Sequence, residues 1–212
     1  MDSTTSAGGT HLSRLMSGAG ALFGGIGLAC TAIIHSGQAI GCVGLEECAS
    51  RPMRTTTPLI AVMGTAALVL LVLGIGGLAL LVIRTGLKPT TAGAGLILLG
   101  IGVGLLLTGG IIQTALGDFP WMPLFVGPGV IAVLAGIAVV AWCSAAVGLL
   151  PLWMAILVGV SAAGALASNE QNTTILFVVP FAIALALMGG YLCVSAFPST
   201  RSRAYESRAR TS

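Results

Sequence analysis

Long uninterrupted apolar runs are the feature that most constrains this chain. A helix that crosses a bilayer needs about 20 mostly apolar residues, because each residue adds roughly 1.5 Å against a hydrocarbon layer about 30 Å thick. Six runs are long enough: Leu15 to His35, Pro58 to Ile83, Ala92 to Ala115, Leu124 to Trp142, Leu149 to Ala167 and Thr174 to Ala196. Because these runs are continuously apolar rather than alternating, we expect helices and not the strands of a barrel.

The composition agrees with a lipid environment. Of the 212 residues, 56% are hydrophobic and only 7% are charged, whereas a soluble domain carries about 25% charged residues. The sequence therefore predicts an all-α, polytopic transmembrane helix bundle with six spans in one domain, residues 15–196. The polar ends, residues 1–14 and 197–212, are expected to be disordered tails.

The basic residues predict the orientation of the bundle. When the six runs alternate in direction, one face receives most of the lysine and arginine residues: Arg14, Arg84, Lys88, Arg201, Arg203, Arg208 and Arg210. Cytoplasmic loops retain such residues, so both termini are predicted to be cytoplasmic. The preference for arginine over lysine is typical of a GC-rich bacterial genome, and we expect a cell membrane location, in a bacterium the inner membrane.

Two alternatives to this topology remain open in the sequence. Only CSAAVG separates the fourth and fifth runs, which allows a re-entrant hairpin in place of two crossings, although Trp142 and Trp153 bracket that turn as interface anchors would. Trp121 in DFPWMP is a third candidate anchor. The first run also permits a cleaved signal peptide, with GQA at 37–39 as the small-residue site, but it is longer than a typical signal core.

Glycines are abundant in the predicted spans and suggest close helix contacts. In lipid, small residues let two helix backbones approach each other and gain dispersion contacts. Gly20 and Gly24 form a small-xxx-small pair in the first run, and Gly100 and Gly104 form another in the third. We predict that both pairs pack against neighbouring helices; a glycine-lined groove for a lipid or small molecule is the alternative.

The segment between the first two runs concentrates reactive residue types. Cys42 and Cys48 lie six positions apart in a predicted extracytoplasmic loop, where oxidation is favoured, so a local disulfide is the leading interpretation. A zinc site built from His35, these cysteines and Glu46 or Glu47 is an alternative, but the spacing matches no common zinc pattern. A thiol redox protein is another, although the chain has no Cys-x-x-Cys motif.

The remaining polar residues of this region are expected to face water. Arg51 and Arg54 are predicted to lie exposed beside the two glutamates, where ion pairs contribute little. His35 ends the first run, within reach of water and headgroups. No ionisable residue falls in the middle of a run, which argues against a proton relay.

These residues predict no catalytic site, metal or cofactor, and no nucleic-acid binding. Nucleotide-loop, metalloprotease and nucleophile-elbow motifs are absent, and no basic surface with aromatic platforms is present. We expect a non-enzymatic accessory, assembly or scaffold subunit whose partners are lipid and other membrane subunits or a second copy. A small transporter or channel-like protein for an uncharged or lipidic substrate is the alternative, and an extracytoplasmic thiol redox protein is the second.

Overall fold

A computed structural model describes residues 4–42, 50, 52, 54, 56–116 and 121–197, without the side chains of residues 4–10, 113, 114 and 116. Every regular element in this described part is helical. The elements are α1 (Thr4–Ser36), α3 (Pro58–Thr85), α4 (Pro89–Leu116), α5 (Pro123–Ala146), α6 (Leu152–Ala165), the 3₁₀ helix η1 (Thr173–Phe177) and α7 (Val178–Ser195). The predicted all-helical class is confirmed. The prediction that residues 1–14 form a disordered tail is wrong for residues 4–14, because they continue α1 beyond its apolar run. The predicted C-terminal tail, apart from Phe197, and residues 43–49, 51 and 53 of the loop after α1 lie outside the described residues.

Prolines and glycines set the helix boundaries. Pro58, Pro89 and Pro123 are the first residues of α3, α4 and α5, the position where a missing N–H costs nothing and a fixed φ favours the helix. Gly86 ends α3 with a φ of 72°, and its N–H donates to the Ile83 carbonyl oxygen. Gly148 has a φ of 75° in the turn after α5. Glycine suits both turns, because a left-handed backbone is strained for other residues.

Five helices are long and apolar enough to cross a membrane: α1, α3, α4, α5 and α7, the last together with η1. Helix α6 has 14 residues, about 21 Å, which is shorter than the hydrocarbon layer. The helix predicted for the fifth span, residues 149–167, is therefore longer than the helix observed there. The reason is local: Leu149 and Leu150 bond through their N–H groups to the Ser144 carbonyl oxygen, and both side chains turn into the core.

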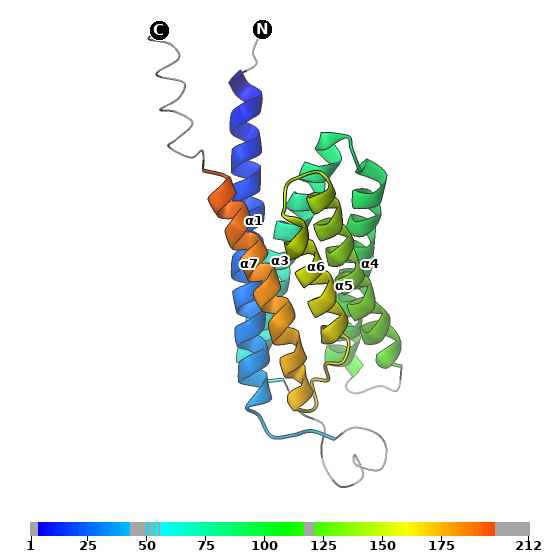
Figure 1. Cartoon of the computed structure of the whole chain (residues 1–212). Coiled ribbons are helices and arrows are strands. Elements are labelled where there is room, and N and C mark those ends of the chain that lie inside the picture. The colour runs from blue at the N-terminus through cyan, green and yellow to red at the C-terminus, as the bar shows by residue number, and fades with distance from the viewer. Residues whose placement is uncertain are drawn as a thin grey trace, which may run out of the picture.

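The helices form two tight groups. Helix α1 lies between α3 and α7 and makes extensive contacts with both, and α4 packs against α5 to a similar extent. Helix α6 touches α5 and α7 and so joins the groups, with α3 against α4 and α5 as a second link. Figure 1 shows the helices side by side, with the start of α1 and the end of α7 at the same end of the bundle.

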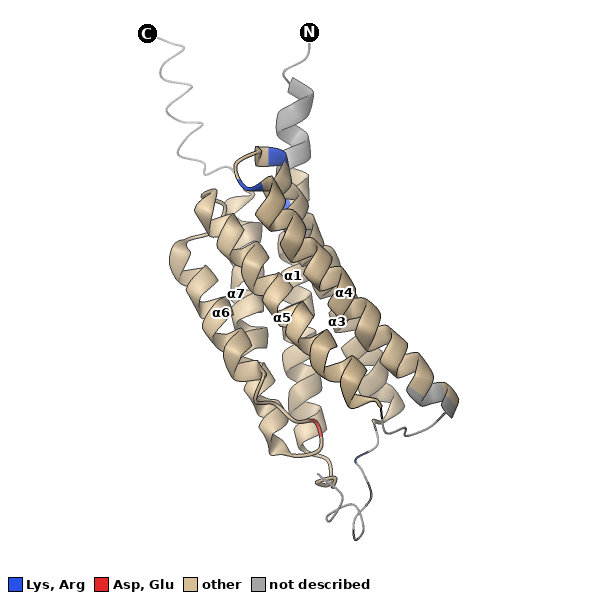
Figure 2. Cartoon of the chain, turned by 90° about the vertical axis from the view of Figure 1, so that its right-hand side faces the viewer, with Lys and Arg blue, Asp and Glu red and all other residues tan. Residues whose placement is uncertain are grey.

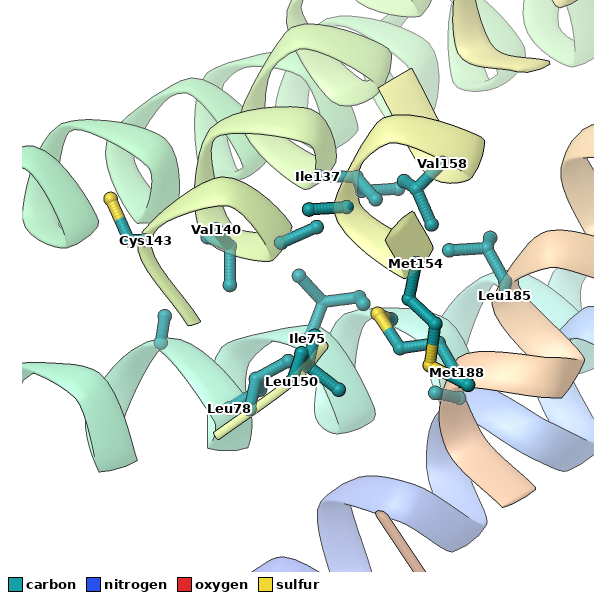
Figure 3. Packing of buried hydrophobic residues seen from close by; sticks show 14 of the residues in the cluster. Ile75, Leu78, Ile137, Val140, Cys143, Leu150, Met154, Val158, Leu185 and Met188 are labelled. Atoms are coloured by element: carbon teal, nitrogen blue, oxygen red, sulfur yellow. The ribbon is translucent and has the colours of Figure 1, made fainter. Parts of the chain in front are cut away.

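Apolar side chains fill the centre of the bundle. Figure 3 shows side chains from four helices meeting there: Ile75 and Leu78 of α3, Ile137 and Val140 of α5, Met154 and Val158 of α6, and Leu185 and Met188 of α7. Seven of these eight are at most 2% exposed, and Met154 is 5% exposed. The buried Ser144 hydroxyl donates to the Val140 carbonyl oxygen one turn earlier, so it needs no partner from the core.

Charge separates the two ends of the bundle. Apart from Arg54, the described lysine and arginine residues gather where α1 begins and α7 ends, and an acidic residue marks the opposite end (Figure 2). The first group includes Arg84 in the last turn of α3 and Lys88 in the turn to α4, while Glu170 lies between α6 and η1. This separation agrees with the predicted grouping of basic residues; the side of the membrane that each end faces stays a prediction.

Candidate functional site

A buried arginine gathers three chain segments at the end of the bundle opposite the basic group. The side chain of Arg54 is 9% exposed, and its guanidinium donates four hydrogen bonds, all to backbone carbonyl oxygens. Nε donates to Ala39 at 2.8 Å, Nη1 to His35 and Glu170 at 3.0 Å each, and Nη2 to Gln38 at 3.0 Å. We call Arg54 and these carbonyl oxygens the arginine clamp.

The location of the clamp explains why a cation is stable there. The last carbonyl groups of a helix have no intrahelical partner and form the negative end of its dipole. Helix α1 ends at Ser36, so Arg54 occupies the place where such acceptors collect. The prediction that Arg54 is an exposed ion-pair residue is wrong, because the carbonyl groups replace water as acceptors. Arg51, Glu46 and Glu47 lie outside the described residues.

Main-chain contacts tie the same segments together. The Arg54 N–H donates to Gln171 Oε1 at 2.7 Å, and the Gly41 N–H donates to the Gln171 carbonyl oxygen at 2.8 Å. The Cys42 N–H donates to the Pro52 carbonyl oxygen at 3.3 Å. The loop after α1 is thereby attached to the loop before η1, across more than 100 residues of sequence.

His35 lies in the clamp region and is buried. It is 5% exposed, and its Nε2 lies 3.1 Å from the Glu170 carbonyl oxygen. Since a carbonyl oxygen only accepts, Nε2 carries the proton in this contact. Nδ1 and Gln38 Oε1 are buried without a hydrogen-bond partner among the described residues. The prediction that His35 is accessible to water is wrong, because the loop that carries Glu170 covers it.

The cysteines divide into bonded and free residues. Cys42 is disulfide-bonded, while the second candidate, Cys48, lies outside the described residues. Cys30, Cys143 and Cys193 are free thiols on three different helices. No group of three His, Cys, Asp or Glu residues in the described part of the chain is placed to hold a metal ion. Glu46 and Glu47, candidates for the predicted zinc alternative, are not described.

Glycines on α1 bring its backbone against two helices. A Cβ added at Gly20 would lie 2.8 Å from Gly74 Cα, and one added at Gly24 would lie 2.8 Å from the Leu71 backbone nitrogen. Both predicted residues therefore lie at the contact with α3. Gly18 and Gly25 make equally close contacts on the side that faces α7. Small residues on two sides allow α1 to sit between its neighbours.

The close contacts follow a spacing of seven residues, which was not predicted from the sequence. Each of the three tight helix pairs is antiparallel and contains two facing pairs of small residues. These facing pairs are Gly20–Gly74 and Gly27–Ala67 between α1 and α3, Gly18–Gly189 and Gly25–Ala182 between α1 and α7, and Gly95–Gly136 and Gly102–Gly129 between α4 and α5. A repeat of seven residues keeps one helix face toward its partner, so each contact extends over two helical turns.

Gly100 and Gly104 do not take part in these contacts. A Cβ added at either position would meet no atom within 4 Å, and both residues are exposed. As a contact within the chain, the predicted pair is wrong, because Gly95 and Gly102 occupy the face of α4 that meets α5. The outward side of α4 thus carries glycines that the described chain leaves uncovered.

The three predicted anchors are exposed at the ends of α5 and α6. Trp121 precedes α5 and is 66% exposed, while Trp142 and Trp153 lie near the turn between α5 and α6 and are 57% and 56% exposed. An exposed indole near a helix end is the arrangement expected of a residue at a membrane interface.

Two grooves open on the outside of the bundle. One, of about 510 Å³, lies between α1 and α7 and includes Cys30, Met154 and Tyr191 in its lining. The other, of about 480 Å³, lies between α1 and α3, with Ser17, Phe23 and Leu73 among its walls and Arg84 at its end. Both are formed at close helix contacts, where glycines leave the surface hollow.

Comparisons with known proteins identify no relative of this chain. No protein-family model matches the chain, and neither the curated proteins nor the solved structures searched contain a match.

Proposed function

We propose that this protein is a non-enzymatic integral membrane subunit that holds a larger membrane assembly together through its outer helix faces. The observation that carries the proposal is the outward side of α4. Gly93 and Gly100 lie seven residues apart there, and a Cβ at either would meet nothing within 4 Å. This spacing is the one that forms all three tight contacts inside the chain, so the same packing is available to a helix from another subunit or a second copy.

The packed interior favours this proposal over the transporter alternative. A transporter for an uncharged or lipidic substrate needs a path between its helices, and the described centre is filled by Leu78, Val140, Val158 and Leu185. Each of these residues is 0% exposed. The surfaces on which the chain can act are then its lipid-facing sides, and α4 has the smallest buried share of the five long helices.

The membrane arrangement is part of the proposal. We infer six crossings in a bacterial inner membrane, with α6 and the loop before η1 together making the fifth and with the basic end of the bundle in the cytoplasm. The clamp then faces the extracytoplasmic side, where a disulfide between Cys42 and Cys48 is stable.

Leucine substitutions on α4 test the proposed contact. Gly100→Leu is expected to abolish recovery of a stoichiometric partner, or of a second copy, when the tagged protein is purified in mild detergent. A leucine side chain would hold a second backbone away from this face. The folded state should be unchanged, because Gly100 has no neighbour within 4 Å.

The matched control is Gly164→Leu on α6, another exposed glycine with no atom within 4 Å of an added Cβ. This variant should retain the partner. Equal loss from both variants, or a wild-type protein that stays monomeric in its native membrane, would refute the proposal.

A further inference from the structure

The groove between α1 and α3 has the dimensions of one leaflet. It extends along α1 from Ser13 to Phe23, ten residues or about 15 Å, which is half of a hydrocarbon layer about 30 Å thick. Its rim is apolar and faces outward: Phe23 is 60% exposed and Leu73 is 66% exposed. In a membrane, the molecule available to this groove is a lipid acyl chain.

One end of the groove is cationic. Arg84 lines it and is exposed, whereas Lys88, four residues further along the chain, is not part of the groove lining. Glu170 is the sole acidic residue among the described ones, and the acidic end of the bundle is opposite (Figure 2). The described part of the chain therefore gives Arg84 no carboxylate partner. A guanidinium at the end of an apolar groove complements a phosphate attached to an acyl chain.

A buried hydroxyl lies deeper in the same groove. Ser17 is 3% exposed and lines the groove, and its Oγ is directed at Gly77 of α3. Ser144 and Ser161 donate to carbonyl oxygens one turn earlier in their own helices, whereas the described residues show no such bond within α1 for Ser17. Gly77 lies seven residues from Arg84, about 10 Å along the helix. A donor at this depth suits the ester groups that join a phosphate to its chains.

We propose that the groove between α1 and α3 binds an anionic phospholipid. Its phosphate contacts Arg84, an ester oxygen accepts a hydrogen bond from Ser17, and one acyl chain lies against Phe23 and Leu73. This site is separate from the α4 face, so it holds whether or not the chain joins a larger assembly.

Lipid titration of the full-length protein in detergent micelles, followed by native mass spectrometry, tests the site. The probes are phosphatidylglycerol and phosphatidylcholine with identical chains. The wild type should prefer phosphatidylglycerol, and Arg84→Gln should weaken that binding about fivefold, the effect of one arginine near an anionic headgroup. Ser17→Ala should weaken both lipids equally, because both carry the ester groups.

The matched control is Lys88→Gln, which removes a charge from the same end without altering the groove lining. It should leave phosphatidylglycerol binding unchanged. A phosphatidylglycerol with a photoreactive acyl chain should label the α1–α3 groove. The proposal is overturned by equal wild-type affinity for the two lipids, by equal effects of Arg84→Gln and Lys88→Gln, by unchanged binding in Ser17→Ala, or by labelling confined to the α1–α7 groove.

Discussion

At the scale of single residues, Arg54 decides how the loop after α1 is held. Its planar guanidinium meets acceptors from two separate segments, the end of α1 and the loop at Glu170. The sequence shows two arginines in this loop and gives no means of choosing between them, since Arg51 and Arg54 have the same residue type and similar neighbours. The choice depends on Glu170 and Gln171, more than 100 residues away.

Replacing Arg54 should destabilise the protein measurably. Arg54→Gln is expected to lower the free energy of unfolding by about 3 kcal/mol, because it leaves several buried carbonyl groups without a donor. Arg54→Lys should recover only part of this loss, since an ammonium group cannot reproduce the fork of a guanidinium. Thermal unfolding in detergent measures the difference.

The control for the clamp is Arg84→Gln, an exposed arginine at the opposite end, which should change stability by less than about 0.5 kcal/mol in lipid-free detergent. An Arg54→Gln variant as stable as the wild type would show that the clamp contributes nothing to folding.

At the scale of helices, small residues seven positions apart determine which faces meet. The glycine content predicts close packing, and Gly20 and Gly24 do lie against α3. The sequence of α4 is ambiguous, however, because Gly93 with Gly100 and Gly95 with Gly102 have the same spacing on different faces. Only the position of α5 selects the second pair, and no local pattern contains that information.

An added methyl group should destabilise the protein on the inner face of α4 and have almost no effect on the outer face. In Gly102→Ala the new Cβ would lie 2.6 Å from the Val133 backbone nitrogen, and we expect a loss of about 2 kcal/mol in unfolding free energy from overpacking. Gly100→Ala meets open space and should change stability by less than about 0.5 kcal/mol. Denaturation of the purified variants in the same detergent compares them, and equal losses would contradict the assignment of the inner face.

At the scale of the whole molecule, the apolar runs predict most of the architecture. Five long helices coincide with predicted runs, because a lipid-spanning helix must be continuously apolar over its whole length. The fifth run predicts too long a helix, since Leu149 and Leu150 are as apolar as the helix that follows, and the composition does not show that their side chains turn into the core. Which end of the bundle faces the cytoplasm is predicted from the basic residues alone.

Accessibility of introduced cysteines tests the predicted topology. A membrane-impermeant maleimide added to intact cells should label Glu170→Cys, whose position is exposed beside the clamp, and should label Lys88→Cys only after permeabilisation. The wild type measures any background from the native thiols. The reverse pattern would show that the bundle has the opposite orientation in the membrane. Labelling of both positions from outside would show that an even number of crossings separates them.

The position of α1 between α3 and α7 has a consequence for biogenesis. During synthesis α3 emerges soon after α1, but α7 emerges after every other described helix, so the side of α1 that carries Gly18 and Gly25 is uncovered until α7 has been made. A nascent chain cut short before Val178 would expose that side in the bilayer. Quality-control proteases that recognise unassembled helices would then have a target that the finished protein conceals.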